Sequence, residues 1–265
     1  MNKRYIGALA LAPLLIFLFL GGYYLKYLVL VLSLCGMYEF YKTTKECDFN
    51  PISIVGYVLC IAYYLPLGQN FNLANQSFYL IGAAFILMII PVLNTKYNFI
   101  DVSLTIMAYL YVAVFFSFIV LVNGKQYGEF LVWLIFISSW GCDTLAYYFG
   151  RYLGKRKISP KVSPKKTLAG SIGGLIGSIL GCSIFGYVIG NYGVSIPIYH
   201  YVIIGLLGGV FGQFGDLVAS SIKRYAKVKD YSNLIPGHGG ILDRFDSILF
   251  VSVVVYYYIT IFVRI

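Results

Sequence analysis

The stretch that decides the fold runs from Gly208 to Asp246 and reads GGVFGQFGDLVASSIKRYAKVKDYSNLIPGHGGILDRFD. It begins as an apolar, glycine-rich segment that contains Asp216, and it becomes polar at Lys223 and Arg224. Hydrocarbon does not solvate a carboxylate, and an Asp at the centre of a membrane helix costs about 2.5–3.5 kcal/mol. A chain that keeps several such carboxylates is expected to pair them with cations, which are either Lys and Arg side chains or a metal ion.

Composition indicates a polytopic membrane protein. Of the 265 residues, 60% are hydrophobic and 11% are charged, and the mean hydropathy is +0.81. A soluble domain carries roughly 25% charged residues. Nine apolar windows, each about the length of a helix that crosses a ~30 Å hydrocarbon core, lie near residues 5–22, 24–41, 52–67, 78–93, 102–122, 130–149, 168–190, 198–222 and 248–264. We therefore predict an all-α polytopic membrane protein with about nine transmembrane helices, of which the first two could form one hairpin.

The charges of the loops predict the orientation in the membrane. Segments 68–77 and 190–199 contain no Lys or Arg, whereas segment 150–167 contains seven and segment 223–247 contains five. The positive-inside rule places the basic segments in the cytoplasm. Nine spans then put the amino terminus in the cytoplasm and the carboxyl terminus outside. Because the net charge of +10 is partly explained by this topology, we expect no nucleic-acid partner.

We expect a single integral membrane domain over residues 1–265. Residues 1–125 would form amino-terminal spans of unclear role, and residues 126–265 would form the catalytic half. Within the spans of the first part the sole acid is Glu39, which could face the site, although its place near Lys42 favours a residue at the membrane interface. The cysteines are scattered and lack CxxC spacing, which predicts neither a disulfide framework nor a zinc site.

The window 130–149 becomes polar toward its cytoplasmic end. Asp143 lies about two turns from that end, after Ser138 and Ser139. One interpretation is a carboxylate near the interface that pairs with Arg151 or Lys155. The polar neighbours favour a water-accessible site.

The basic segment 150–167 ends in Ser163-Pro164-Lys165-Lys166-Thr167. A basic loop beside a membrane often acts only as a topology signal or attracts anionic lipid. Here Thr167 can cap the helix that follows, whose amino terminus has unpaired N–H groups and the positive end of the helix dipole. Lys165 and Lys166 at this place favour a phosphate-binding site.

Rows of small residues predict that the windows 168–190 and 198–222 pack closely. The rows include Gly170, Gly174 and Ser178 in the first window and Gly205 and Gly209 in the second. Small residues four apart let helices approach in lipid, where packing has no hydrophobic drive. We expect this packing to bring Lys165 and Lys166 near the cytoplasmic end of the second helix.

Polar groups then gather along the stretch from Gly208 to Asp246. Asp216, Ser220 and Lys223 follow at i, i+4 and i+7, which places them on one helical face. The run Gly237-His238-Gly239-Gly240 can present several backbone N–H groups as an anion nest.

Two more carboxylates follow the glycine run. Asp243 and Asp246 lie three residues apart with Arg244 between them, so a helix would place both on one face. Clustered carboxylates, lysines and a glycine nest at a membrane surface fit a magnesium–polyphosphate site.

The same stretch resembles the signature of the phosphatidate cytidylyltransferases, also called CDP-diacylglycerol synthases. The matching pattern is Ser220-x-Ile222-Lys223-Arg224-x4-Lys229-Asp230-x-Ser232-x2-Ile235-Pro236-x-His238-Gly239-Gly240-Ile241-x-Asp243-Arg244-Phe245-Asp246. Similar supporting runs are Asp143-x2-Ala146-Tyr147-x2-Gly150-Arg151-x2-Gly154-Lys155 and Ser163-Pro164-Lys165-Lys166-Thr167. The resemblance covers residues 140–246 well and residues 1–125 by hydropathy alone. In one departure, Ala169 stands where the family usually has Glu, which removes a carboxylate from the site.

The resemblance implies a membrane nucleotidyltransferase of phospholipid biosynthesis. It would condense CTP with phosphatidic acid and release CDP-diacylglycerol and pyrophosphate. In such a reaction, positioning and charge neutralisation supply most of the reduction in the barrier. We expect the enzyme in the cell membrane, or the inner membrane of a Gram-negative cell, with its active site facing the cytoplasm. A homodimer is a further expectation.

The expected site residues divide by role. Asp216 and Asp243 would bind Mg²⁺, and Asp143 and Asp246 would be outer or second ligands, so these four are the catalytic candidates. The residues expected to bind substrate are Lys165, Lys166, Thr167, Ser220, Lys223, Arg224, His238, Gly239, Gly240 and Arg244.

Two other classes of function fit parts of this pattern. A CTP-dependent lipid kinase would also need an acidic, basic and glycine-rich cytoplasmic site, but its products would be a phospholipid and CDP. A transporter could use Asp143 and Asp216 as an ion or proton pathway. The carboxylates crowd one side of the membrane, however, whereas transporter sites lie near the midplane between inverted repeats.

Overall fold

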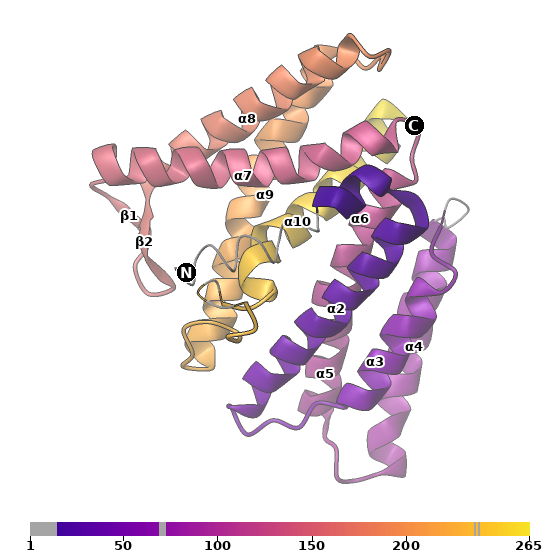
Figure 1. Cartoon of the computed structure of the whole chain (residues 1–265). Helices are drawn as coiled ribbons and strands as arrows, with labels where there is room; N and C mark the ends of the chain where they lie inside the picture. Colours follow the sequence, from indigo (N-terminus) through magenta and orange to yellow (C-terminus); the bar gives the residue numbers. More distant parts are fainter. Residues whose placement is uncertain (1–14, 69–72, 236, 238) are drawn as a thin grey trace. The chain divides into compact units, whose positions relative to one another are not determined.

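The computed structural model is mainly helical and describes residues 15–68, 73–235, 237 and 239–265 (Figure 1). Its elements are α2 (Gly22–Lys45), α3 (Ser53–Tyr64), α4 (Leu73–Leu93), α5 (Phe99–Ala108), the π-helix η1 (Tyr109–Val114), α6 (Phe115–Asn123), α7 (Gly128–Leu153), β1 (Lys157–Ser159), β2 (Ser163–Thr167), α8 (Leu168–Gly190), α9 (Ile198–Tyr225), α10 (Leu242–Tyr258) and the π-helix η2 (Ile259–Val263).

The chain divides into two compact units. Of the described residues, those up to Gly124 and those in Tyr225–Arg244 form the first unit, and Lys125–Arg224 and Phe245–Ile265 form the second. Helix α10 therefore starts in the first unit and continues in the second. The single integral membrane domain expected over residues 1–265 stays a prediction.

Most of the predicted membrane windows are helices of sufficient length. Among the described residues, six stretches are long and apolar enough to cross a membrane: Ala74–Leu93, Phe99–Asn123, Gly128–Leu153, Leu168–Gly190, Ile198–Tyr225 and Leu242–Val263. Window 52–67 contains α3, which has only 12 residues. Window 24–41 lies in α2, a continuous helix of 24 residues that contains Lys26 and Glu39 within this window and is not among the six stretches. Window 5–22 falls largely outside the described residues. A polytopic, mainly helical fold is therefore confirmed.

Buried hydroxyl groups connect the helices of the first unit. The Tyr64 hydroxyl lies 2.8 Å from the Ser33 hydroxyl of α2, and it donates to the Ala113 carbonyl of η1 at 3.0 Å. The Tyr63 hydroxyl lies 2.9 Å from the Ser117 hydroxyl of α6. Polar groups in an apolar interior must find partners within the protein, so these contacts fix how α2, α3 and the α5–α6 region pack.

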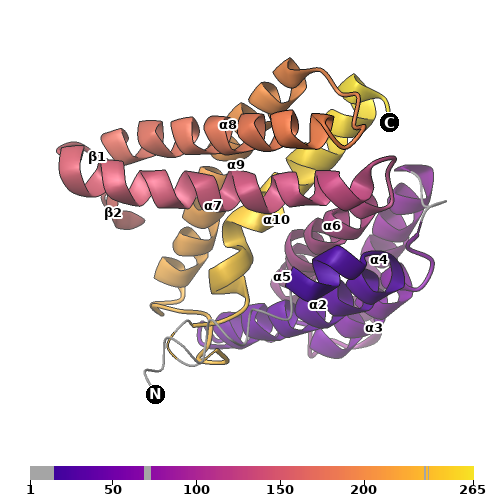
Figure 2. The same cartoon turned by 45° about the horizontal axis from the view of Figure 1, so that its top comes forward.

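Glycines bring the helices of the second unit into close contact (Figure 2). A Cβ atom added to Gly141 of α7 would lie 2.9 Å from the Gly177 carbonyl oxygen of α8. The Ser178 hydroxyl of α8 donates to the Gly205 carbonyl of α9 at 2.6 Å. The predicted close packing of 168–190 against 198–222 is therefore confirmed. The equally close approach of α7 was not predicted.

The basic segment 150–167 contains a short antiparallel hairpin that the sequence did not indicate. Strands β1 and β2 pair Lys157 with Thr167 and Ser159 with Ser163. The strands are mainly polar and lack the alternation of apolar and polar residues that marks a half-buried strand. Thr167 caps α8, as predicted, because its hydroxyl accepts the N–H of Gly170 at 3.1 Å.

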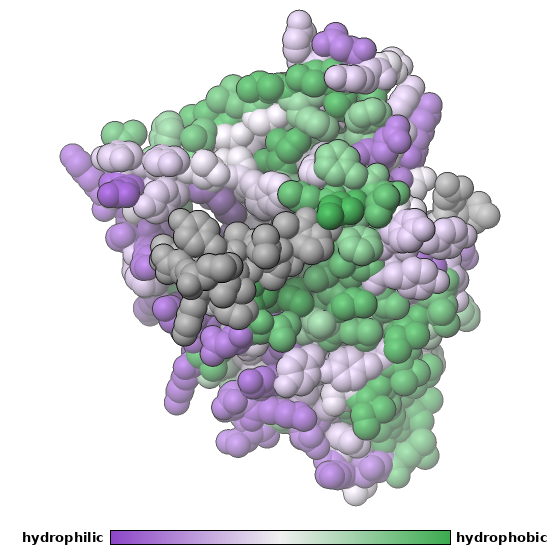
Figure 3. Space-filling model, in the orientation of Figure 1, coloured by the Kyte–Doolittle hydropathy of each residue, from purple (hydrophilic) through white to green (hydrophobic). Residues whose placement is uncertain are grey.

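Large apolar side chains face outward in both units, as Figure 3 shows for one side. Phe85 of α4 is 68% exposed, and Ile184 of α8 is 63% exposed. Soluble proteins rarely expose contiguous apolar patches larger than a few hundred Å². Outward apolar side chains are what contact with lipid requires, which agrees with the membrane-spanning helices.

Candidate active site

Lys166 and Asp216 form an ion pair in the second unit. Lys166 lies on β2 and Asp216 on α9, and the lysine Nζ is 2.6 Å from Oδ2 of the aspartate. The same Nζ donates to the Gln213 carbonyl at 3.2 Å. The two side chains are 22% and 33% exposed, respectively. Because the pair is partly exposed, solvent screens the attraction between the two charges, and a ligand in the cleft can reach both groups.

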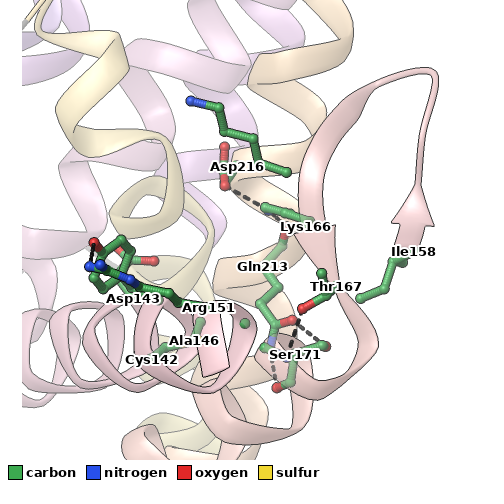
Figure 4. Close-up of a pocket in the computed structure, with 14 residues that line it drawn as sticks. Cys142, Asp143, Ala146, Arg151, Ile158, Lys166, Thr167, Ser171, Gln213 and Asp216 are labelled. Carbon is green, nitrogen blue, oxygen red and sulfur yellow. Dashed lines mark hydrogen bonds and ion pairs between the residues drawn. The ribbon is translucent and has the colours of Figure 1, made fainter. Parts of the chain in front are cut away.

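The ion pair lies at a cleft of about 360 Å³ within the second unit (Figure 4). Cavities of roughly 300–1,000 Å³ are typical of small-molecule sites. The predicted site residues that line this cleft are Asp143, Lys165, Lys166, Thr167 and Asp216. The cleft therefore brings together residues from α7, β2 and α9 that the sequence assigned to one site.

Asp143 is exposed and lines the cleft, which agrees with its interpretation as part of a water-accessible site. Arg151, two turns further along α7, also lines the cleft. Its guanidinium donates to the Tyr147 hydroxyl at 3.0 Å. A carboxylate and a guanidinium on one helix can thus both reach a ligand in the cleft.

Gln213 and Ser171 are cleft residues that the sequence analysis missed. The Gln213 amide nitrogen donates to the Ser171 carbonyl at 3.2 Å and to the Gly209 carbonyl at 3.1 Å. The Ser171 hydroxyl in turn donates to the Gln213 side-chain oxygen. These bonds join the first turn of α8 to α9 directly beside Lys166. The available signal was an uncharged polar residue one turn before Asp216 in an apolar helix.

Asp216 also contacts the next turn of α9. The Ser220 hydroxyl donates to Oδ1 of Asp216 at 3.3 Å, which confirms the helical spacing predicted for this pair. Asp246, on the part of α10 that belongs to the second unit, interacts electrostatically with Asp216, Asp143 and Lys223. The second unit therefore gathers three of the four predicted catalytic carboxylates near two lysines.

Asp243, the fourth carboxylate, belongs to the first unit and organises the loop before α10. Its Oδ2 atom accepts the backbone N–H of Tyr231 at 2.8 Å and that of Gly240 at 2.9 Å. Gly239 has a φ of 84°, which a glycine adopts without strain. The Gly240 N–H, which the sequence assigned to an anion nest, thus donates to a carboxylate of the chain itself. His238 lies outside the described residues.

The remaining predicted cations take different positions. Lys223 is buried, at 8% exposure. Arg224 is exposed, and its Nε donates to the Val162 carbonyl in the hairpin turn at 3.4 Å. Lys165 is exposed at the cleft, and Arg244 is exposed in the first turn of α10, within the first unit.

Glu39 is the main residue whose position the sequence did not predict. Its side chain is fully buried within the first unit, at 0% exposure, so the expectation that it lies at the membrane interface stays a prediction. Its carboxylate accepts the Ser232 hydroxyl at 2.6 Å and the backbone N–H groups of Ile241 at 2.9 Å and Leu242 at 2.8 Å. The signal was present, since an acid inside an apolar span is by default a candidate functional residue.

Known proteins are similar to this chain over nearly its whole length. Residues 2–262 match the cytidylyltransferase family. The phosphatidate cytidylyltransferase of Bacillus subtilis (strain 168) is 32% identical over 268 residues, which cover 99% of this chain and 98% of the relative. That of Staphylococcus haemolyticus (strain JCSC1435) is 34% identical over 249 residues, which cover 91% of this chain and 93% of the relative. Since the match includes the first 125 residues as well as the signature stretch, the chain belongs to the cytidylyltransferase family.

Proposed function

We propose that the protein is a membrane nucleotidyltransferase that condenses CTP with phosphatidic acid to give CDP-diacylglycerol and pyrophosphate. A phosphatidate oxygen would attack the α-phosphorus of CTP. A new P–O bond would form as the bond to the β-phosphate breaks, and pyrophosphate would leave. Membership of the cytidylyltransferase family and the names of the full-length relatives support this assignment. The observation that carries it is the cleft in which Lys166 meets Asp216.

The chain's own residues would bind and orient the phosphates. Lys165 and Lys166 precede α8, and the first-turn N–H groups of a helix bind anions. Such a reaction needs little covalent help from the protein, because alignment and charge neutralisation lower most of the barrier. The further residues that we propose to contact substrate are Thr167, Ser220, Lys223, Arg224, His238, Gly239, Gly240 and Arg244.

The carboxylates fit Mg²⁺, which prefers oxygen ligands. We propose Asp216 and Asp243 as its ligands, with Asp143 and Asp246 as outer or second ligands. The described residues contain no group of three or more Asp, Glu, His or Cys side chains placed to hold a metal by themselves. Magnesium sites in phosphate chemistry commonly use one or two carboxylates together with substrate phosphates. When bound, the ion would neutralise charge on the phosphate oxygens.

The lysine asymmetry supports a finer proposal for topology. We propose nine spans, a cytoplasmic amino terminus and an active site that opens to the cytoplasm, in the cell membrane or in the inner membrane of a Gram-negative cell. CTP would then arrive from the cytoplasm, while phosphatidate would enter from the surrounding lipid. A homodimer remains part of this proposal.

Two labelled nucleotides test the reaction. Purified protein in lipid nanodiscs would receive phosphatidate, Mg²⁺ and CTP labelled at either the α- or the γ-phosphate. Nucleotidyl transfer should place the α-label in the lipid and the γ-label in pyrophosphate. Transfer of the γ-label to the lipid would instead identify a CTP-dependent kinase, and phosphatidate without either label would overturn the nucleotidyltransferase assignment.

A further inference from the structure

Glu39 has three strong hydrogen bonds to one loop, although it lies on a different helix. The loop comprises the described residues between Tyr231 and Leu242, and both it and α2 belong to the first unit. Oε1 of Glu39 accepts the Ser232 hydroxyl and the Ile241 N–H, while Oε2 accepts the Leu242 N–H. Hydrogen bonds to an ionised carboxylate are shorter and stronger than those between neutral groups. Glu39 therefore holds both the beginning and the end of the loop.

Two of these bonds cap the amino terminus of α10. The first N–H groups of a helix have no partner within the helix and need one from elsewhere. Leu242 is the first residue of α10, and Glu39 supplies the acceptor for it and for Ile241. A carboxylate also interacts favourably with the positive end of the helix dipole. The start of α10 is thus set by a residue 203 positions earlier in the sequence.

The glycine beside these bonds leaves no room for a side chain. A Cβ atom added to Gly240 would lie 2.6 Å from both carboxylate oxygens of Glu39. The Gly240 N–H donates to Asp243. The backbone at Gly240, Ile241 and Leu242 therefore donates hydrogen bonds to two carboxylates, those of Glu39 and Asp243.

We propose that Glu39 is a positioning residue that holds Asp243 and the loop before α10 in the geometry used for phosphate transfer. The proposal rests on the proposed function, because Asp243 is one of its catalytic candidates. It assigns a task to the amino-terminal spans, for which the sequence indicated no chemistry. In this role Glu39 would act through the protein alone, because its hydrogen bonds are with Ser232, Ile241 and Leu242. Its effect passes through the backbone of Ile241 and Leu242 to the neighbouring Asp243.

Hydrogen exchange and kinetics on the full-length protein test this role. In Glu39→Gln an amide donor replaces one carboxylate oxygen, so at least one backbone N–H loses its acceptor. The amides of Ile241 and Leu242 should exchange faster with solvent. The kcat for CDP-lipid formation should fall on the order of 10- to 100-fold, since small displacements of positioned groups have effects of this size. The matched control is Glu46→Gln, an exposed acid just after α2 that should change neither measurement.

Ser232→Ala keeps the test decisive if Glu39→Gln folds poorly, and a double-mutant comparison of Gly240 with Glu39 adds to it where the Glu39 variants fold. Ser232→Ala removes one of the three bonds and should give a smaller change in the same direction. Gly240→Ala should slow turnover in the wild-type background. In a Glu39→Ala background, where the carboxylate no longer occupies the space, the same change should add little. Such non-additivity is expected for residues that are in contact or share a hydrogen-bond network, and not for distant, independent sites.

The outcomes separate this proposal from the proposed function. Wild-type turnover by folded Glu39→Gln protein would overturn the positioning role, even if its melting temperature were lower, because the residue would then be merely structural. Unchanged exchange at Ile241 and Leu242 would also overturn it. A wild-type protein that forms no CDP-lipid would overturn the proposed function, whereas the exchange measurement would still decide whether Glu39 orders the loop.

Discussion

The Asp243 carboxylate and the Gly240 amide are joined by a hydrogen bond of 2.9 Å, and the same Oδ2 atom accepts the N–H of Tyr231 at 2.8 Å. One oxygen of Asp243 thus closes the loop before α10. An Asn side chain has one oxygen that can accept both bonds, but it carries no charge. Substitution at this position can therefore separate the charge of Asp243 from its role in the loop.

We predict that Asp243→Asn folds normally and loses on the order of 100-fold or more in kcat, because charge stabilisation in the transition state is lost. Thermal melts with and without Mg²⁺ and CTP provide the measurement. The wild type should be stabilised by the ligands, and the variant should not. Asp48→Asn is the control, because Asp48 is exposed with a φ of 61°, a conformation that Asn also adopts. An active Asp243→Asn enzyme with normal magnesium dependence would exclude Asp243 as a ligand.

Lys166→Ala should chiefly impair the use of CTP. We expect kcat/KM for CTP to fall on the order of 100-fold, while the melting temperature changes little because the pair with Asp216 is partly exposed. Lys161→Ala removes an exposed lysine of the same segment and should leave kcat/KM unchanged. If a Lys165→Ala/Lys166→Ala double variant kept full activity per inserted molecule, the lysines would be topology signals only.

Replacement of Ala169 by Glu tests the departure from the family pattern. The first turn of α8 contains no acidic residue, and a carboxylate there interacts favourably with the helix dipole. We expect Ala169→Glu to fold and to keep or raise kcat. Leu168→Glu adds the same charge to the same turn and should raise stability without raising kcat. A rise in kcat for both variants would point to the dipole and not to a missing site residue.

The close approach of α7 to α8 makes Gly141 sensitive to substitution. Gly141→Ala places a methyl group against the Gly177 carbonyl and should destabilise the protein by about 1–3 kcal/mol. Gly82→Ala, in α4, meets no atom within 4 Å. It should stabilise the protein by about 0.5–1 kcal/mol, because Ala favours the helix over Gly. Denaturation in detergent measures both effects, and equal effects of the two variants would contradict the packing described here.

Cysteine labelling in sealed vesicles tests the topology. In a background without Cys35 and Cys47, which are half-buried, single cysteines would be placed at exposed positions. Lys161→Cys and Lys229→Cys should react only from the cytoplasmic side, and Ser195→Cys only from outside. A cysteine at 229 that reacts only from outside would overturn both the orientation and the cytoplasmic site.

Local spacing explains what could be predicted from the sequence. The Thr167 cap and the Asp216–Ser220 contact depend on residues three or four apart in one helix, so helical geometry alone implies them. Lys166 was expected near α9 because the glycine rows of α8 and α9 imply close packing, and its contact with Asp216 confirms this.

The missed features depend on distant partners or on weak patterns. Glu39 binds residues more than 190 positions away, and no local pattern indicates such a contact. The hairpin of β1 and β2 is mainly polar, so it lacks the periodic signal of a strand. Gln213 was overlooked because a single uncharged polar residue in a glycine-rich helix resembles a packing residue.

The ion pair of Lys166 and Asp216 has a thermodynamic consequence for the order in which ligands bind. A phosphate group that takes Lys166 leaves the Asp216 carboxylate unpaired, and a cation that takes Asp216 leaves the ammonium unpaired. Either ligand alone leaves one of these two charges without a partner, whereas the phosphate and the cation together give each charge a partner. Binding of each should therefore strengthen binding of the other by the same factor, and the cleft would favour a nucleotide already complexed with its cation over either species alone.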